Sequence, residues 1–333
     1  MIWAWLGFLA FVGVLLALDL GVFNKKAHAP SMTEALLFTS GVVTLALAFT
    51  ALVWVSYHNH WFELGNYVDA VDRQVNDGRL AAVKFLTGYV IELSLSMDNV
   101  FVIALIFAHL RTPTALQHRV LFWGILGALG MRGAMIGVGA ALVARYHWVL
   151  YLFGAFLVYT GARMLATSAE EDAPGETWVM RQLRKYFPIT EDFHGSRFSV
   201  VLNGRRWLTP LAVALVLVET TDLIFAVDSI PAIFAITADP FLVFTSNVFA
   251  ILCLRSLYFG LAGLIERFKY LKVSLSFILA LVGVKMLTAT WLIRWFGEML
   301  NFWMLGVVAG ILLVGGLAST LSTRPPSSSE RRW

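Results

Sequence analysis

Two apolar stretches of this chain carry carboxylates at places where a membrane-spanning helix has few polar residues. The stretches are VIELSLSMDNVFVIALIF (residues 90–107) and LVETTDLIFAVDSIPAIFAIT (residues 217–237). Their acidic residues are Glu92, Asp98, Glu219, Asp222 and Asp228. Because a charge at the centre of a bilayer costs about 2.5–3.5 kcal/mol on insertion scales, such residues usually face a partner charge, water or an ion. The pattern predicts an ion site inside a membrane domain, and a set of structural Arg–carboxylate pairs is the alternative.

The side chains around these acids favour a hard cation. Hydroxyl and amide groups lie close to the acids in sequence, among them Asn99 and Ser229. Carboxylate, hydroxyl and amide oxygens suit Mg²⁺, Ca²⁺ and Mn²⁺, and no His or Cys lies near the acids in sequence. Met97 is a candidate softer ligand for a transition metal, although plain packing of its side chain is the preferred interpretation. We therefore predict that the five acids bind a divalent cation.

Basic residues within the apolar segments partly balance the acids. They are Arg132, Arg163, Arg255 and Lys285. With Asp19, near the end of the first apolar run, this count sets six acids against four bases, and the surplus of two negative charges equals one divalent cation. Since a cation repels a cation, we expect these bases to keep nearby acids ionised rather than to act as ligands. Asp19 either lines an entrance or extends to the membrane surface.

The composition indicates an integral membrane protein. Of 333 residues, 59% are hydrophobic and 14% are charged, and the mean hydropathy is +0.76. Soluble proteins carry about 25% charged residues. The net charge of +4 comes with basic residues that flank apolar runs, so we expect the lipid bilayer as a partner and no nucleic acid. The single cysteine, Cys253, excludes a disulfide within the chain.

Apolar runs of about twenty residues, the length that crosses a bilayer core of roughly 30 Å, occur nine times. We predict an all-α polytopic membrane protein with spans at 2–23, 34–57, 82–108, 117–141, 146–167, 208–236, 241–263, 272–293 and 299–321. The first run is expected to be a retained helix rather than a cleaved signal, since no positive charge precedes it. Most Lys and Arg residues fall on the side of the C-terminal tail, which predicts an outside N-terminus and a cytoplasmic C-terminus.

Two parts of the chain share three pairs of motifs in the same order. The pairs are 92–104 with 222–235, 123–142 with 246–265, and 156–165 with 278–287. Each copy has three spans, an odd number, so the second copy is predicted to be inverted in the membrane, which is typical of secondary transporters. The predicted divisions are two N-terminal helices and an outer loop (1–79), the first three-helix repeat (80–167), a cytoplasmic loop (168–206), the inverted second repeat (207–293), and the ninth helix with a disordered tail (294–333).

The loop between the second and third predicted spans holds four further acids. They are Glu63, Asp69, Asp72 and Asp77. We expect them to form a solvated face, with attraction of cations as the alternative.

Three motifs resemble hallmark sequences of the TerC/Alx family of bacterial integral membrane proteins. They are LALDLGVFNKKAH (16–28), ELSLSMDNVFVIALIF (92–107) and LVLVETTDLIFAVDSIPAIFAIT (215–237). The resemblance implies a bacterial inner (plasma) membrane location and the handling of divalent metals, chiefly manganese export. The family also carries the labels tellurium resistance and membrane-bound redox modulator. Its functional acids correspond here to Glu92, Asp98, Glu219, Asp222 and Asp228.

Residues and resemblance together predict a secondary transporter that exports Mn²⁺ from the cytoplasm in exchange for protons. The expected central ligands are Asp98 and Asp228, with the other acids beside them and Glu219 as a ligand or a proton carrier. No nucleotide-binding or cofactor motif is present, so we expect no enzymatic activity and no permanently bound cofactor. The alternative is a membrane scaffold or metal-delivery partner that binds other membrane proteins through residues 168–206.

Overall fold

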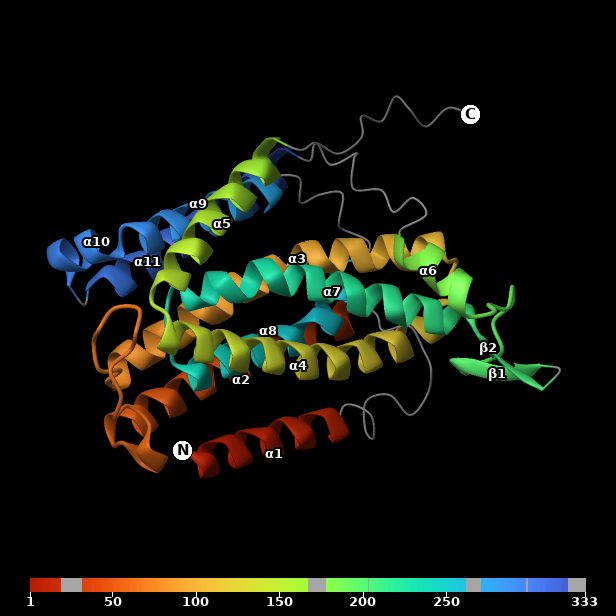
Figure 1. Ribbon diagram of the computed structural model, residues 1–333, viewed down its shortest axis with the longest axis horizontal. Helices are drawn as coiled ribbons and strands as arrows, with labels where there is room; N and C mark the ends of the chain where they lie inside the picture. The colour runs from red at the N-terminus through yellow and green to blue at the C-terminus, as the bar shows by residue number, and fades with distance from the viewer. Residues whose placement is uncertain (19–31, 167–177, 203, 262–270, 298, 323–333) are drawn as a thin grey trace.

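Helices account for most of the chain in the computed structural model (Figure 1). It describes residues 1–18, 32–166, 178–202, 204–261, 271–297 and 299–322. The helices are α1 (Ile2–Leu18), α2 (Met32–His58), α3 (Gly78–His109), α4 (Thr114–Arg145), α5 (Trp148–Ala166), α6 (Trp178–Tyr186), α7 (Pro210–Phe234), α8 (Pro240–Leu261), α9 (Leu271–Leu287), α10 (Ala289–Phe296) and α11 (Met299–Ser322). Of these, α1, α2, α3, α4, α7 and α8 run in roughly one direction, while α5 and α9 are tilted against them (Figure 1). The described residues also form a short 3₁₀ helix, η2 (Trp61–Glu63), and two strands, β1 (Ser199–Leu202) and β2 (Arg205–Leu208).

Seven of the described helices are long and apolar enough to cross a membrane, which confirms a multi-pass membrane protein. α9 and α10 would together make an eighth span, but their axes bend by 85°. The predicted span at 272–293 therefore falls on a bent pair of helices rather than on one continuous helix. α1 is a shorter apolar helix over its described residues. The number of nine spans stays a prediction.

The two ends of the bundle differ in structure (Figure 1). At one end, which we call the loop end, residues 59–77 fold between α2 and α3, and the N-terminal amine lies 3.0 Å from the carboxylate of Glu63. At the other, which we call the hairpin end, lie α6 and the antiparallel pair of β1 and β2. The predicted cytoplasmic loop, 168–206, thus contains a helix and most of a hairpin, and the fold is mostly rather than purely helical.

The boundaries of the helices at the loop and hairpin ends follow local chemistry. Asp77 caps α3, because its side chain accepts the N–H group of Leu80 over 2.7 Å. α7 begins with Pro210, whose fixed φ suits the first helical position. α8 begins in the same way at Pro240, directly after Asp239.

Both helices that carry the predicted ligands are continuous. α3 runs without a break over 32 residues, and Pro231 of α7 lies only in its last turn. Residues six apart on a straight helix point about 120° away from each other. The acids of each pair, Glu92 with Asp98 and Asp222 with Asp228, therefore face different neighbours.

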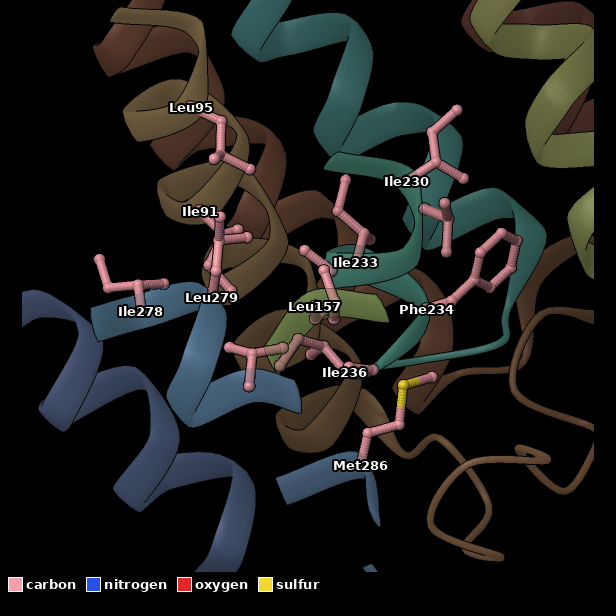
Figure 2. Close-up of a cluster of buried hydrophobic side chains, with 14 of the residues drawn as sticks. Ile91, Leu95, Leu157, Ile230, Ile233, Phe234, Ile236, Ile278, Leu279 and Met286 are labelled. Atoms are coloured by element: carbon pink, nitrogen blue, oxygen red, sulfur yellow. The ribbon is translucent and has the colours of Figure 1, made fainter. Parts of the chain in front are cut away.

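The core that joins the helices combines side chains from both predicted repeats. Figure 2 shows residues of α3, α5, α7 and α9 meeting in one apolar cluster. Its labelled members include Ile91, Leu157, Ile233, Phe234 and Leu279. Van der Waals contacts of this kind hold the helices together. The hydrophobic effect contributes little between helices inside a membrane, because lipid tails are as apolar as leucine.

Glycines allow a close approach of two helices, α5 and α9. A Cβ atom added at Gly161 would lie 2.8 Å from the backbone oxygen of Ser276. One added at Gly283 would lie 2.7 Å from the backbone oxygen of Gly154. Small residues at such crossings let backbones touch, which is the usual way that membrane helices gain van der Waals contact.

Candidate functional site

Arg132, on α4, lies at the centre of a buried ion-pair network between α3, α4 and α7. Its side chain is 2% exposed. Nε and Nη2 donate to the two carboxylate oxygens of Asp222, over 3.1 Å and 2.9 Å. Nη1 donates to Oε1 of Glu92, which is fully buried. Because a bidentate guanidinium–carboxylate pair fixes the orientation of both partners, the network holds the three helices in one arrangement.

Polar side chains from α3, α7 and α8 surround this network. The amide of Asn99 donates to Oδ1 of Asp222 over 2.8 Å. Nη1 of Arg132 also lies 3.4 Å from Oγ of Ser229 and 3.4 Å from Oδ1 of Asn247. Two carboxylates share one guanidinium, so the network keeps one negative charge when both acids are ionised.

Three buried oxygen atoms on α3 have no hydrogen-bond partner among the residues that the structure describes. They are Oε2 of Glu92, Oγ of Ser96 and Oδ1 of Asn99. Spacings of four and three residues place them on the same side of the helix. A buried polar atom without a partner costs about 1–3 kcal/mol, so a proton or a cation bound there would be stabilised.

The other three predicted ligands have different surroundings. Asp228 is half-buried and accepts a hydrogen bond from the hydroxyl of Thr160 on α5 over 3.4 Å. Glu219 is half-buried, and its carboxylate lies so close to Gly127 of α4 that an added Cβ atom would overlap it. Asp98 is half-buried on α3. Glu92 and Asp222 thus come together at Arg132, whereas Asp228 lies against α5 and Glu219 lies against α4 at Gly127.

The five acids do not form one metal site in this structure. Among the described residues, no three His, Cys, Asp or Glu side chains come close enough to hold a metal ion. Arg132 instead occupies the space between Glu92 and Asp222, where it supplies the positive charge. A cation that binds several of these acids at once needs a different arrangement of their helices.

Other residues that the sequence singled out fall elsewhere. Asp19 and the side chain of Arg255 lie outside the described part of the chain. Lys285 is buried on α9, and its Nζ donates to the backbone oxygen of Ala235 over 2.6 Å. The charged group that acts most strongly on it is Asp72, from the loop end. Lys285 therefore adjoins a different cluster from the intramembrane acids that it was expected to balance.

That second cluster was not predicted from the sequence. The fully buried ammonium of Lys84 lies 2.8 Å from Oδ2 of Asp69, 2.8 Å from Oδ2 of Asp72 and 2.6 Å from Oδ1 of Asn76. Both acids are buried, so the expectation that they belong to a solvated face is wrong. Lys84 was the available signal, because it lies inside the third apolar run and was left out of the charge count. An ammonium buried there needs a partner.

Two carboxyl groups of the loop end have shifted pKa values. Burial raises the pKa of Asp69, but the charge of Lys84 and hydrogen bonds from Lys84 and Thr237 outweigh burial and hold that pKa below its ordinary value. Burial also raises the pKa of Asp239, and the hydrogen bond from Tyr57 only partly opposes it. Asp239 is therefore the acid of this pair that takes up a proton more readily.

A comparison with known protein families identifies the family of this chain. A family model described as "Integral membrane protein TerC family" matches residues 78–326. The chain belongs to the TerC family. The matched TerC region includes α3 and α7 and thus both acid-bearing helices. It confirms the family resemblance and contains the second and third of the three motifs, at 92–107 and 215–237.

TerC relatives cover nearly the whole chain. The "Uncharacterized membrane protein STKORF319" of Myxococcus xanthus is 47% identical over 98% of this chain and 94% of its own length. The "Putative membrane-bound redox modulator Alx" of Escherichia coli (strain K12) is 44% identical over 93% of this chain and 92% of its own length. No solved structure matches the chain.

Proposed function

We propose that this TerC protein is a secondary transporter that exports Mn²⁺ from the cytoplasm in exchange for protons. One observation carries the proposal: Glu92 and Asp222, buried within the membrane region, share the single guanidinium of Arg132. Buried carboxylates in excess of their counter-charge are expensive in a membrane and are typical of ion pathways and proton relays. In this proposal the protein has no enzymatic activity and no permanently bound cofactor, and the metal ion is the transported substrate.

The oxygens near Arg132 support a hard cation as the cargo. Glu92, Ser96 and Asn99 offer carboxylate, hydroxyl and amide oxygens from one side of α3, and each has one buried atom without a partner among the described residues. Such ligands suit Mn²⁺ better than zinc or copper. An ionised carboxylate can bind either the metal ion or a proton, and either one neutralises its charge. Such a group provides the exchange directly.

We propose that Asp98 and Asp228 are the central ligands of the transported ion. Asp228 accepts a hydrogen bond from the hydroxyl of Thr160 over 3.4 Å, and the charge of Arg163, on the same helix as Thr160, also acts on it, so a cation would compete with both. Both acids are half-buried on α3 and α7, two of the three helices that carry the Arg132 network. A shift of α3 against α7 therefore changes both sets of acids together.

We further propose an inverted repeat of three helices within a bundle of nine spans. If α3 corresponds to α7 and α4 to α8, then the pairs α3 with α8 and α7 with α4 are equivalent, and both pairs are in contact. α5 and α9, the third corresponding pair, contact each other directly. Nine spans follow if α1, the seven long helices and the bent pair α9–α10 each cross once. The loop end would face outward from a bacterial inner membrane and the hairpin end would face the cytoplasm.

A second candidate function is a membrane scaffold or metal-delivery partner. Its supporting observation is the folded region at the hairpin end, where Tyr186 and Val201 are 68% and 66% exposed. Exposed apolar side chains on a folded element suit a protein partner.

Purified protein in vesicles distinguishes the two candidates. Wild-type protein alone should move Mn²⁺ across the vesicle membrane, and a pH gradient of either sign should drive the ion toward the more acidic side. Flux with no pH dependence would rule out proton exchange. If no tested metal moves in either gradient, the scaffold function becomes the better account, and substitutions at Tyr186 and Val201 should then abolish partner binding.

A further inference from the structure

The loop between α2 and α3 is folded into the end of the bundle rather than lying over it. Its backbone closes on itself, since the N–H group of Asp69 donates to the oxygen of Gln74 over 2.8 Å, and Val68 forms a bridge with Val75. Asp69, Asp72 and Asn76 then point inward and are 2–5% exposed. A surface loop with buried charged side chains is unusual and requires partners for each of them.

The partners come from several helices. We call the set of Asp69, Asp72, Asn76, Lys84, Thr237 and Asp239 the loop-end cluster. Asp69 accepts hydrogen bonds from the hydroxyl of Thr237 and, over 2.9 Å, from the N–H group of Ala238, both in the connection between α7 and α8. Asp72 accepts from the amide of Asn301 on α11 over 3.0 Å. The cluster thereby ties the loop to the ends of α3, α7, α8 and α11.

The loop-end cluster and the Arg132 network lie on the same helices. Lys84 precedes Glu92 by eight residues on α3, which is about 12 Å at a rise of 1.5 Å per residue. Asp239 precedes Asn247 of α8 by the same number of residues. Because α3 starts at the loop end, the cluster lies between the loop-end surface and the buried acids. The cluster would therefore lie on the route of a cation that leaves the acids along these helices toward the loop end.

Ion pairs suit a seal that has to open and close. Burial of the charges has a large desolvation cost, which offsets much of their attraction in the closed state. On opening, water solvates both partners, whereas an apolar seal would expose surface that water does not stabilise. The closed and open states are therefore closer in free energy with a seal made of Lys84, Asp69 and Asp72 than they would be with an apolar seal.

We propose that the loop-end cluster is the gate that closes the ion site from the loop-end side, and that the ammonium of Lys84 holds it shut. The inference rests on the proposed transport function. In the open state the two ion pairs of Lys84 are broken and residues 64–77 move away from α3 and α8. The structure then represents the state that is closed at the loop end.

Thiol labelling tests the gate without measuring transport. The reporter is Ser246→Cys on α8, a position 1% exposed whose hydroxyl faces Gly88, midway between Lys84 and Glu92 on α3. The background is Cys253→Ala, so the reporter is the only thiol. A membrane-impermeant maleimide is applied to intact cells and to inverted vesicles, and Glu63→Cys, at an exposed position, shows which preparation presents the loop end.

With the wild-type gate, the Ser246→Cys thiol should react slowly from both sides. Lys84→Met should raise its labelling rate from the loop-end side by at least about tenfold, because removal of one partner from a buried ion pair strongly destabilises the closed state. Arg79→Met is the matched control, since Arg79 is an exposed base on the first turn of the same helix, and it should leave the rate unchanged. Labelling from the hairpin end should not change.

An unchanged rate in folded Lys84→Met protein overturns the inference. If that variant does not fold, Asp72→Asn takes its place, because it leaves the ion pair with Asp69 intact, and a rate no higher than that of Arg79→Met then overturns the inference. If the wild type transports Mn²⁺ but the labelling rate of Lys84→Met is unchanged, the gate proposal is wrong and the proposed function stands. Faster labelling of Lys84→Met with no wild-type flux would remove the proposed function and leave a loop that opens.

Discussion

Removal of the guanidinium at position 132 should expose how strongly the buried acids depend on it. In Arg132→Met, Glu92 and both oxygens of Asp222 lose their charged donor while they stay buried. Breaking a buried ion pair by removal of one partner costs about 3–5 kcal/mol. One guanidinium serves two carboxylates here, so we expect a loss at the upper end of that range in the free energy of unfolding.

A second substitution tests the physical reason for that loss. In Arg132→Met with Asp222→Asn, one of the two uncompensated carboxylates is gone, and contacting residues typically couple by about 0.5–3 kcal/mol. The double variant should therefore recover about 2 kcal/mol relative to Arg132→Met alone. Arg145→Met, an exposed position at the end of the same helix, should change stability by less than about 0.5 kcal/mol.

The assay is reversible unfolding of the purified variants in mixed micelles with increasing denaturing detergent. The reasoning is refuted if Arg132→Met loses no more stability than Arg145→Met. It is also refuted if Asp222→Asn adds to the loss instead of reducing it, because the buried, unpaired carboxylate would then not be its cause.

Three further substitutions test other parts of the structure, with Gly137→Ala as a common control, since no atom lies within 4 Å of a Cβ atom added there. Gly283→Ala should destabilise by about 1–3 kcal/mol in the same unfolding assay, because its methyl group would meet the backbone of α5 at 2.7 Å. Gly127→Ala should reduce Mn²⁺ flux in vesicles at least tenfold, roughly 1.4 kcal/mol, by displacing the carboxylate of Glu219, and flux equal to that of the control would contradict this. The stability of Asp239→Asn relative to the wild type should increase as pH rises from acid to neutral. The pKa of Asp239 is raised in the folded state, which therefore binds the proton more tightly than the unfolded state does, so wild-type stability falls with rising pH until this group is ionised. Thermal unfolding of both proteins across this pH range checks the sign.

The Arg132 network was largely foreseeable from the sequence, and the reason is energetic. Isolated charges in apolar runs must be paired or bound, so Glu92, Asp222 and Arg132 stood out individually. Which base would meet which acid was not foreseeable, because the contact joins residues 40 and 90 positions apart. Lys285 shows the limit: a base in an apolar run was identified, but its neighbours at the loop end depend on the packing of α9.

The loop end was missed for a related reason. A loop sequence with several acids looks solvated, and only its folding into the bundle buries Asp69 and Asp72 against Lys84. The bend between α9 and α10 also lacks a sequence signal, since neither glycine nor proline stands at Thr288, where the helix breaks. There the hydroxyl bonds back to the oxygen of Val284 over 2.7 Å, a local contact that competes with helix continuation.

The most direct test of the account is Mn²⁺ flux in vesicles that contain only this protein and its variants Asp98→Asn and Asp228→Asn, singly and combined. Glu63→Gln, which changes an exposed acid at the loop end, is the control. The account predicts that wild type and control move Mn²⁺ at equal rates, and that the combined variant folds normally but moves none. Normal flux through the folded combined variant would contradict it.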